Sequence, residues 1–223
     1  DGKQDLVSAN RGAWNITFMQ GDGLGGFGKV VNYELTNAEA GDLVAGDFNG
    51  DRKLDLVQSN LGSNSGSLML GNGAGAFGKP IQINLTHPTT AVAPRQVVAG
   101  DYNRDGKQDL AFGQSGSLAV VLGDGKGGFG APVVYTGTSF DHELLAADMN
   151  GDGVEDLVGS DGISSVAVAV GDGAGNFGVP YMGKAPALPT EIVVADFNDD
   201  GRLDVATPYA AQSKLAILFN ACR

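Results

Sequence analysis

The sequence is poor in several residue types, and each shortage excludes a class of protein. Only one of the 223 residues is a cysteine, so a framework of internal disulfides is excluded. Cys222 is therefore expected to be either a free thiol or bonded to a cysteine in a segment that would precede Asp1. No run of 18 apolar residues occurs, so we expect no membrane-spanning segment. Basic residues number 14 against 26 acidic ones, and the net charge of −12 disfavours nucleic acid as a partner because like charges repel.

Residues and motifs typical of catalytic sites are also scarce. The chain has two histidines, His87 and His142, and neither is spaced from a nucleophile or a metal ligand in a recognisable arrangement. It contains no Gly-x-Ser-x-Gly, no His-Glu-x-x-His and no phosphate-binding glycine loop with its lysine. We therefore predict that the protein is not an enzyme and has no catalytic residues.

Glycine and aspartate, by contrast, recur in fixed patterns. The 36 glycines far exceed the usual share of roughly 7%, and without a three-residue period they indicate many tight turns. A nine-residue pattern with side-chain oxygens at positions 1, 3, 5 and 9 occurs four times: Asp47, Asn49, Asp51 and Asp55; Asp101, Asn103, Asp105 and Asp109; Asp148, Asn150, Asp152 and Asp156; Asp196, Asn198, Asp200 and Asp204. Residues 1–5 match only the second half of the pattern, with Asp1 and Asp5.

This pattern predicts a loop folded around Ca²⁺. Calcium takes six to eight oxygen ligands, which alternate side chains and one main-chain carbonyl, here that of Lys107, can supply. Four calcium ions would neutralise much of the net charge, since 14 of the 26 acidic residues are loop aspartates. An EF-hand is excluded because position 12, where it needs a glutamate, is occupied by Gln58, Phe112, Gly159 and Thr207.

The loops repeat with the period of a four-stranded unit. The aspartates at position 5 are 50, 54, 47 and 48 residues apart, counting from Asp1. A glycine-rich turn follows each loop by 14 to 16 residues, and it begins at Gly21, Gly71, Gly123 and Gly171. Short apolar stretches rich in β-branched residues surround both motifs, and no helical period occurs, so we expect an all-β chain.

Because such units cannot bury their faces alone, we predict a β-propeller of four-stranded blades. It would form one domain, or an arc of one, over residues 1–223. The repeats are expected at approximately 1–40, 41–93, 94–141, 142–189 and 190–223, with the first and last incomplete. Two sets of large apolar side chains are predicted to pack between blades. The first set occupies position 2 of the loop and consists of Phe48, Tyr102, Met149 and Phe197. The second set is the aromatic residue of each glycine turn and consists of Phe27, Phe77, Phe129 and Phe177.

The alternation of Asp-Phe-Asn-Gly-Asp loops with Gly-Asp-Gly-x-Gly-x-Phe-Gly turns resembles the FG-GAP or VCBS repeats of integrin-α-like β-propellers, over essentially the whole chain. The resemblance implies a bladed ring, typically of seven blades, with one calcium ion per loop. It also implies main-chain ligands at Lys53, Lys107, Val154 and Arg202, and an incomplete fifth site at Asp1, Lys3 and Asp5. Arg52 replaces a loop glycine, which predicts strain of about 1 kcal/mol if that residue is left-handed.

These features predict an extracellular or cell-surface recognition and adhesion module, lectin-like, that binds a glycan or protein ligand. Cytosolic calcium is too scarce to fill such loops, which favours secretion. Two alternatives remain: a structural protein that forms homo-oligomers through its incomplete terminal blades, and an accessory propeller of a larger secreted enzyme. Candidate contact residues are the insertion at 86–94 and the aromatic residues Trp14, Tyr33, Tyr135, Tyr181 and Tyr209.

Overall fold

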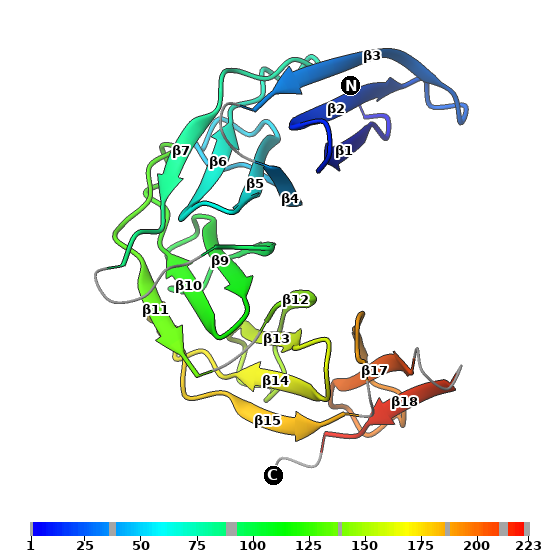
Figure 1. Cartoon of the computed structure of the whole chain (residues 1–223), viewed down its shortest axis with the longest axis vertical. Coiled ribbons are helices and arrows are strands. Elements are labelled where there is room, and N and C mark those ends of the chain that lie inside the picture. Colours follow the sequence, from blue (N-terminus) through cyan, green and yellow to red (C-terminus); the bar gives the residue numbers. More distant parts are fainter. Residues whose placement is uncertain are drawn as a thin grey trace.

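The computed structural model shows five antiparallel sheets that follow one another around an open arc (Figure 1). It describes residues 2–35, 39–87, 93–137, 140–185, 188–209 and 214–220. All regular elements in these ranges are β-strands, as predicted, and none of the ranges contains an apolar helix long enough to cross a membrane. The first and last sheets lie at opposite ends of the arc (Figure 1).

The three middle sheets have four strands each, and chain order is also spatial order within each sheet. The second sheet contains β4 (Glu39–Gly46), β5 (Asp55–Leu61), β6 (Ser65–Met69) and β7 (Ile81–Asn84). The third contains β8 (Gln96–Gly100), β9 (Asp109–Gln114), β10 (Ser117–Val121) and β11 (Val133–Thr136). The fourth contains β12 (Glu143–Ala147), β13 (Asp156–Ser160), β14 (Ser165–Ala169) and β15 (Tyr181–Lys184).

The two end sheets have three described strands each. The first sheet contains β1 (Leu6–Asn10), β2 (Asn15–Gly21) and β3 (Phe27–Glu34). The fifth contains β16 (Val193–Ala195), β17 (Asp204–Tyr209) and β18 (Lys214–Leu218). By alignment with the loops and glycine turns of the middle sheets, the described strands of the first sheet match the second to fourth strands of a four-stranded sheet, and those of the fifth match the first to third.

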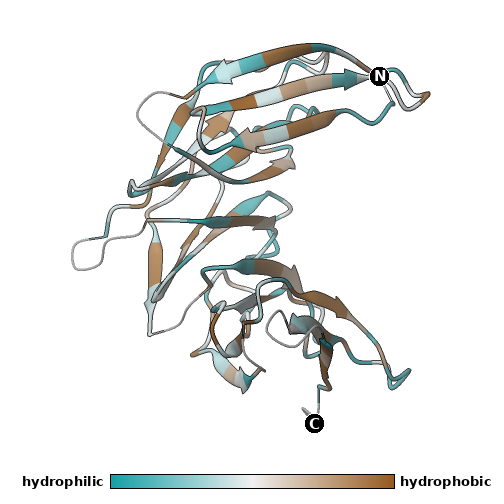
Figure 2. Ribbon diagram, turned by 45° about the vertical axis from the view of Figure 1, so that its right-hand side comes forward, coloured by the Kyte–Doolittle hydropathy of each residue, from teal (hydrophilic) through white to brown (hydrophobic). Residues whose placement is uncertain are grey.

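Burial within a sheet follows the sequence pattern. In the third sheet, the second and third strands, β9 and β10, are buried throughout. The fourth strand lies on the convex side of the arc, and β15 is exposed along its whole length. Figure 2 shows apolar segments along the strands and hydrophilic segments at many of the turns that connect them. The fourth strands therefore form the outer, solvent-facing side of the sheets.

The hydrophobic core lies between sheets rather than inside any one of them. Leu68, Phe112 and Val121 belong to a cluster between the second and third sheets, and Leu118 and Leu157 to one between the third and fourth. Two further clusters join the first sheet to the second and the fourth to the fifth. Each sheet therefore depends on its neighbours for burial, as the repeat pattern predicted.

Two aromatic contacts and two backbone hydrogen bonds recur at the middle junctions. The ring centroids of Phe48 and Phe129 are 6.2 Å apart, and those of Tyr102 and Phe177 are 5.3 Å apart. The glycine turn of the following sheet also donates an amide hydrogen to the carbonyl of the loop aromatic residue. These bonds join Gly127 N to Phe48 O at 2.9 Å and Gly175 N to Tyr102 O at 3.0 Å. The predicted packing between neighbouring repeats is confirmed at these positions.

The same prediction is wrong for the two end sheets. Phe27 in the first sheet is 52% exposed, and Phe197 in the fifth is 41% exposed. Both residues occupy the predicted structural position, but no neighbouring sheet covers them among the described residues. The aligned residue of the fourth sheet, Met149, is buried because the fifth sheet packs against it.

Candidate functional site

The aspartate-rich loops connect the first and second strands of sheets two to five. In the loop of the third sheet, the carboxylate of Asp101 accepts hydrogen bonds from the amides of Asp105 (3.0 Å) and Gly106 (2.8 Å). The side-chain oxygen of Asn103 accepts another from Asp105 (3.0 Å), and Asp105 accepts one from the amide of Lys107 (3.0 Å). The oxygen side chains thus hold the tight turn by bonding its backbone amides.

The other three loops repeat this network with the aligned residues. Asp47, Asp148 and Asp196 each accept amide hydrogens from the residues that follow, and the aligned asparagines and aspartates do the same: Asn49, Asp51, Asn150, Asp152, Asn198 and Asp200. The predicted main-chain ligands Lys53, Val154 and Arg202 lie at the aligned seventh position, where each donates its amide hydrogen to the fifth-position aspartate.

Each loop has two residues in the left-handed region. Position 6 has φ +79° at Gly106, and Arg52 at the same position has φ +64°, so the arginine adopts the conformation that favours glycine. Position 4 is left-handed too, including Arg104 and Asp199 at φ +59°. The strain at position 6 was predicted from the sequence. The left-handed conformation at position 4 was not predicted from the sequence, because the residue type at this position differs between the loops.

The aspartate at position 9 lies in the interior. Asp55, Asp109 and Asp156 are completely buried, and each accepts two amide hydrogens, one from position 2 of its own loop and one from the first glycine of the following turn. Burial raises the pKa of all three carboxyls, and the carboxylates at positions 5 and 1 of the same loop raise the pKa further, while the amide bonds lower it. Three negative groups therefore interact in each loop.

The chemistry of this donor set fits a hard cation. No group of three or more His, Cys, Asp or Glu side chains in the described ranges is arranged as a metal site. The loops offer carboxylate and carboxamide oxygens whose mutual repulsion a cation would relieve, and these are the ligands that calcium prefers. In the N-terminal half-loop, Asp5 accepts a hydrogen bond from Gly21 N at 2.9 Å, and Asp1 lies outside the described residues.

The first glycine of each turn is required by close packing. A Cβ atom on Gly71 would collide with the carbonyl oxygen of Leu54. The fifth sheet has Asn220 at this position, and the amide of Asn220 bonds to Asp204 at 2.8 Å as the glycine amides do. Its side-chain nitrogen donates to Met149 O at 2.7 Å, which is aligned with the loop carbonyls that a glycine turn bonds at the two middle junctions. The repeat pattern of the sequence did not predict that the side chain of Asn220 takes the place of a glycine-turn amide in this hydrogen bond.

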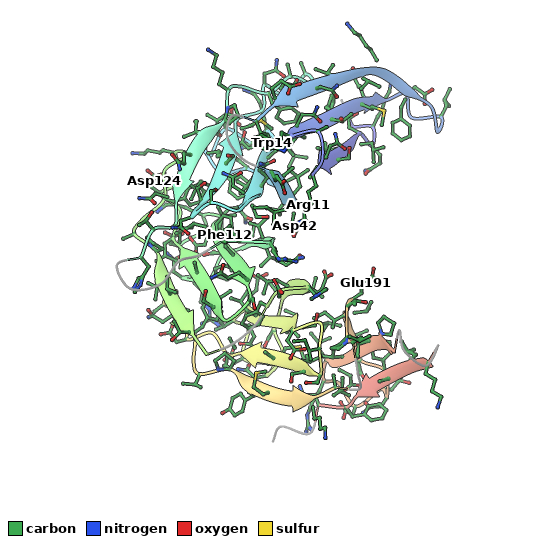
Figure 3. The ribbon with its side chains drawn as sticks, in the orientation of Figure 1. Arg11, Trp14, Asp42, Phe112, Asp124 and Glu191 are labelled. Carbon is green, nitrogen blue, oxygen red and sulfur yellow. The ribbon has the colours of Figure 1, made fainter. Side chains whose placement is uncertain are left out.

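A polar depression of about 350 Å³ lies on the concave side of the arc, at the starts of the inner strands. Six polar residues from four sheets contribute to its lining: Arg11, Asp42, Arg95, Gln96, Asp141 and His142. Arg95 pairs with Asp141 at 3.1 Å, and Arg11 pairs with Glu39 at 3.4 Å. Figure 3 shows Arg11 and Asp42 together, with Glu191 across the open centre.

Asp42 links two sheets at this depression. Its carboxylate accepts amide hydrogens from Leu43 (2.8 Å) and from Val97 of the next sheet (3.1 Å). Burial raises the pKa of Asp42, and these two bonds lower it. Burial also raises the pKa of Glu143, and the nearby Asp42 and Glu191 carboxylates raise it further. The centre of the arc is therefore acidic, with two guanidinium groups at its rim.

The predicted contact residues have different roles. Tyr33 and Tyr135 bond the backbone of the following sheet at Phe77 N (3.2 Å) and Phe177 N (3.0 Å), so both stabilise junctions. Trp14 and Tyr181 are exposed. The Tyr209 side chain and residues 88–92 of the predicted insertion lie outside the described part of the chain, as does Cys222.

The sequence model of the FG-GAP-like repeat family matches residues 1–58, 59–112, 101–159 and 148–207. The chain therefore belongs to the FG-GAP-like repeat family, and with its sheets it is a β-propeller protein. A search of curated protein sequences gave no match.

Similar solved structures include a lectin from Agrocybe aegerita, described as specifically recognising non-reducing terminal N-acetylglucosamine. It is 19% identical, with a TM-score of 0.61 over 99% of this chain and 67% of the lectin. The NanB sialidase from Streptococcus pneumoniae is 12% identical, with a TM-score of 0.54 over 92% of this chain and 34% of the sialidase. Identities this low establish the fold alone, and that fold serves both a lectin and an enzyme.

Proposed function

We propose that this chain is a calcium-stabilised, non-enzymatic extracellular recognition module that binds glycans at the concave depression. The observation that carries the proposal is the composition of that depression, where carboxylate, carboxamide, imidazole and guanidinium groups from several sheets converge. Such groups donate and accept the hydrogen bonds that sugar hydroxyls need. The likeness to the Agrocybe aegerita lectin supports a glycan ligand over a protein one.

The proposed calcium ions have a structural role, separate from ligand binding. In the second sheet, Ala40, Gly41 and Asp42 contribute to the depression at the start of β4, whereas the loop begins at Asp47, after the end of β4. Calcium would neutralise the loop carboxylates and so stabilise the connection between the first two strands of each blade. The metal would then affect glycan affinity only through the integrity of the fold.

A glycan panel followed by titration calorimetry tests this function. We expect binding of at least one glycan class in calcium buffer. Gln96→Ala and Arg95→Ala should each weaken that binding at least tenfold, with little change in melting temperature. Lys79→Ala, at an exposed position outside the depression, is the matched control and should bind like the wild type. Absence of binding across the panel, or equal affinity for all variants, would contradict the proposal.

A second candidate is an accessory propeller within a larger secreted enzyme. The observation that favours it is the match to one third of the NanB sialidase. The intact mass of the natural protein, isolated from culture medium, distinguishes the two candidates. A mass well above 22.7 kDa with hydrolase activity supports the enzyme part, and a glycan-binding protein without hydrolysis supports the recognition module.

A further inference from the structure

The residue at position 7 of the aspartate-rich loop differs between sheets and divides the loops into two kinds. Lysine occupies this position in the second and third sheets, as Lys53 and Lys107, whereas the fourth sheet has Val154. The main chain is arranged alike in all three, since each position-7 amide bonds the aspartate at position 5. The side chain at position 7 therefore varies while the loop around it stays the same.

Both lysine side chains are held against the glycine turn of their own sheet. A Cβ atom on Gly73 would lie 3.0 Å from Cδ of Lys53, and one on Gly125 would lie 2.8 Å from Cδ of Lys107. Val154 packs on the aligned glycine of the fourth sheet in the same way. The aliphatic part of each lysine therefore has a fixed path along the turn, and its ammonium group is directed back to the loop.

That ammonium group lies at the position-5 carboxylate. Lys53 Nζ donates to Asp51 Oδ2 at 3.1 Å, and Lys107 Nζ donates to Asp105 Oδ2 at 2.9 Å. Both aspartates are predicted calcium ligands. Each lysine thus places a positive charge within hydrogen-bond distance of a carboxylate that calcium would bind.

The fourth and fifth loops satisfy the same carboxylate oxygen with a neutral group. Asp152 Oδ2 accepts a hydrogen bond from Asn150 Nδ2 at 2.9 Å, and Asp200 Oδ2 accepts one from Asn198 Nδ2 at 3.2 Å. The fifth loop has Arg202 at position 7, and no ion pair in the described part of the chain joins it to Asp200. The position-5 carboxylates of these two loops therefore keep their full charge for a cation.

We propose that Lys53 and Lys107 lower the calcium affinity of their own loops, so that the second and third sheets hold two weaker sites and the fourth and fifth hold two tighter ones. The inference rests on the calcium binding proposed above and is independent of glycan binding. Calcium affinity depends on the number of charged ligands in a loop, and the ammonium offsets one of three carboxylates. A single and a double positive charge about 6 Å apart in water also repel each other enough to weaken binding about tenfold at low ionic strength.

Calcium titration by calorimetry at low ionic strength tests the inference. The wild type should show two classes of site whose dissociation constants differ about tenfold. The double variant with Lys53→Met and Lys107→Met keeps an unbranched side chain on each glycine turn but removes the charge. Its weaker class should tighten about tenfold and merge with the other class. The double variant with Lys53→Arg and Lys107→Arg keeps the charge and should keep the weaker class.

Lys126→Met is the matched control for net charge. Lys126 is exposed in the glycine turn of the third sheet, where its amide bonds Asp124 instead of a loop carboxylate, so this variant should retain both wild-type classes.

Melting curves supply a second readout. The double methionine variant should melt below the wild type in excess chelator, because its loop carboxylates lose a counter-ion. It should melt above the wild type in calcium that only partly fills the weaker sites, because more of its sites are occupied. A purely structural role of the lysines would shift the melting temperature in the same direction under both conditions and would overturn the proposal.

The remaining outcomes separate this inference from the calcium assignment. A single class of site in the wild type, or unchanged dissociation constants in the double methionine variant, would overturn the inference and leave calcium binding intact. Tightening of the same size in the Lys126→Met variant would reveal a general effect of net charge and would overturn it too. Absence of calcium binding in every protein would refute the calcium assignment together with the inference.

Discussion

The third and fifth sheets carry the same repeated motifs but differ in what surrounds them. In the third sheet, neighbours cover both faces, and Phe112 and Tyr102 are buried. In the fifth sheet, one face is covered and the other exposes Phe197 and Ile217. The position of a residue in the repeat therefore determines where its side chain points, whereas the neighbouring sheet determines whether that side chain is buried.

Calcium removal should have the largest effect, because four of the five sheets have a complete loop. Ligand binding to the folded state stabilises by about 4 kcal/mol per site when the free ligand is a thousandfold above Kd. We expect excess chelator to lower the melting temperature substantially and calcium to restore it, with about four ions bound per chain by calorimetry. An unchanged melting curve in chelator would refute the calcium assignment.

Truncation of a core aromatic tests the comparison directly. Phe112→Ala should cost about 3–5 kcal/mol of unfolding free energy, because a large buried side chain leaves a cavity. Ile217→Ala in the fifth sheet should cost under about 1 kcal/mol, since its side chain is partly exposed. Urea unfolding measures both in monomeric protein at low concentration. Equal losses would mean that the face of the fifth sheet that exposes Ile217 is covered in solution.

The backbone strain at position 6 of the loop predicts a stabilising change in the second sheet. Arg52→Gly should raise the free energy of unfolding by about 1 kcal/mol, because glycine adopts a positive φ at no steric cost. The reciprocal variant Gly106→Arg, where a Cβ would meet no other atom, should destabilise the third sheet by a similar amount. If Arg52→Gly instead destabilises the protein, the arginine side chain contributes contacts that outweigh the strain.

The smallest effect concerns the acidic centre that middle and end sheets share. The pKa of Glu143 is raised in the fold, so its protonation favours the folded state and its contribution is lost as pH rises through the folded pKa. Glu143→Gln should therefore raise the melting temperature at pH 7 and leave it unchanged near pH 4. The comparison is made in calcium-saturated protein. A variant with the same shift at both pH values would show that the charge of Glu143 is not responsible.

Most of the fold could be predicted from the sequence, because the loops and glycine turns recur at nearly constant spacing and each strand has a local apolar signal. The proposed ligand residues were found for the same reason. The exposure of Phe27 and Phe197 could not be predicted, since it depends on whether a neighbouring sheet covers each residue and not on the residue itself. The depression around Asp42 could not be predicted either, because the residues that line it come from four sheets and share no sequence motif.

The hydrogen bond from Asn220 to Met149 has a consequence for the order in which the junctions close during synthesis. At the middle junctions, the carbonyl of the loop aromatic accepts its hydrogen bond from the fifth residue of the next glycine turn, Gly127 or Gly175, so this bond forms only after that turn has been synthesised. Between the fourth and fifth sheets, the carbonyl of Met149 is satisfied by the first residue of the aligned segment, Asn220, two residues after the end of β18. As the chain leaves the ribosome, the fifth sheet can therefore dock as soon as its third strand has emerged, without a completed turn.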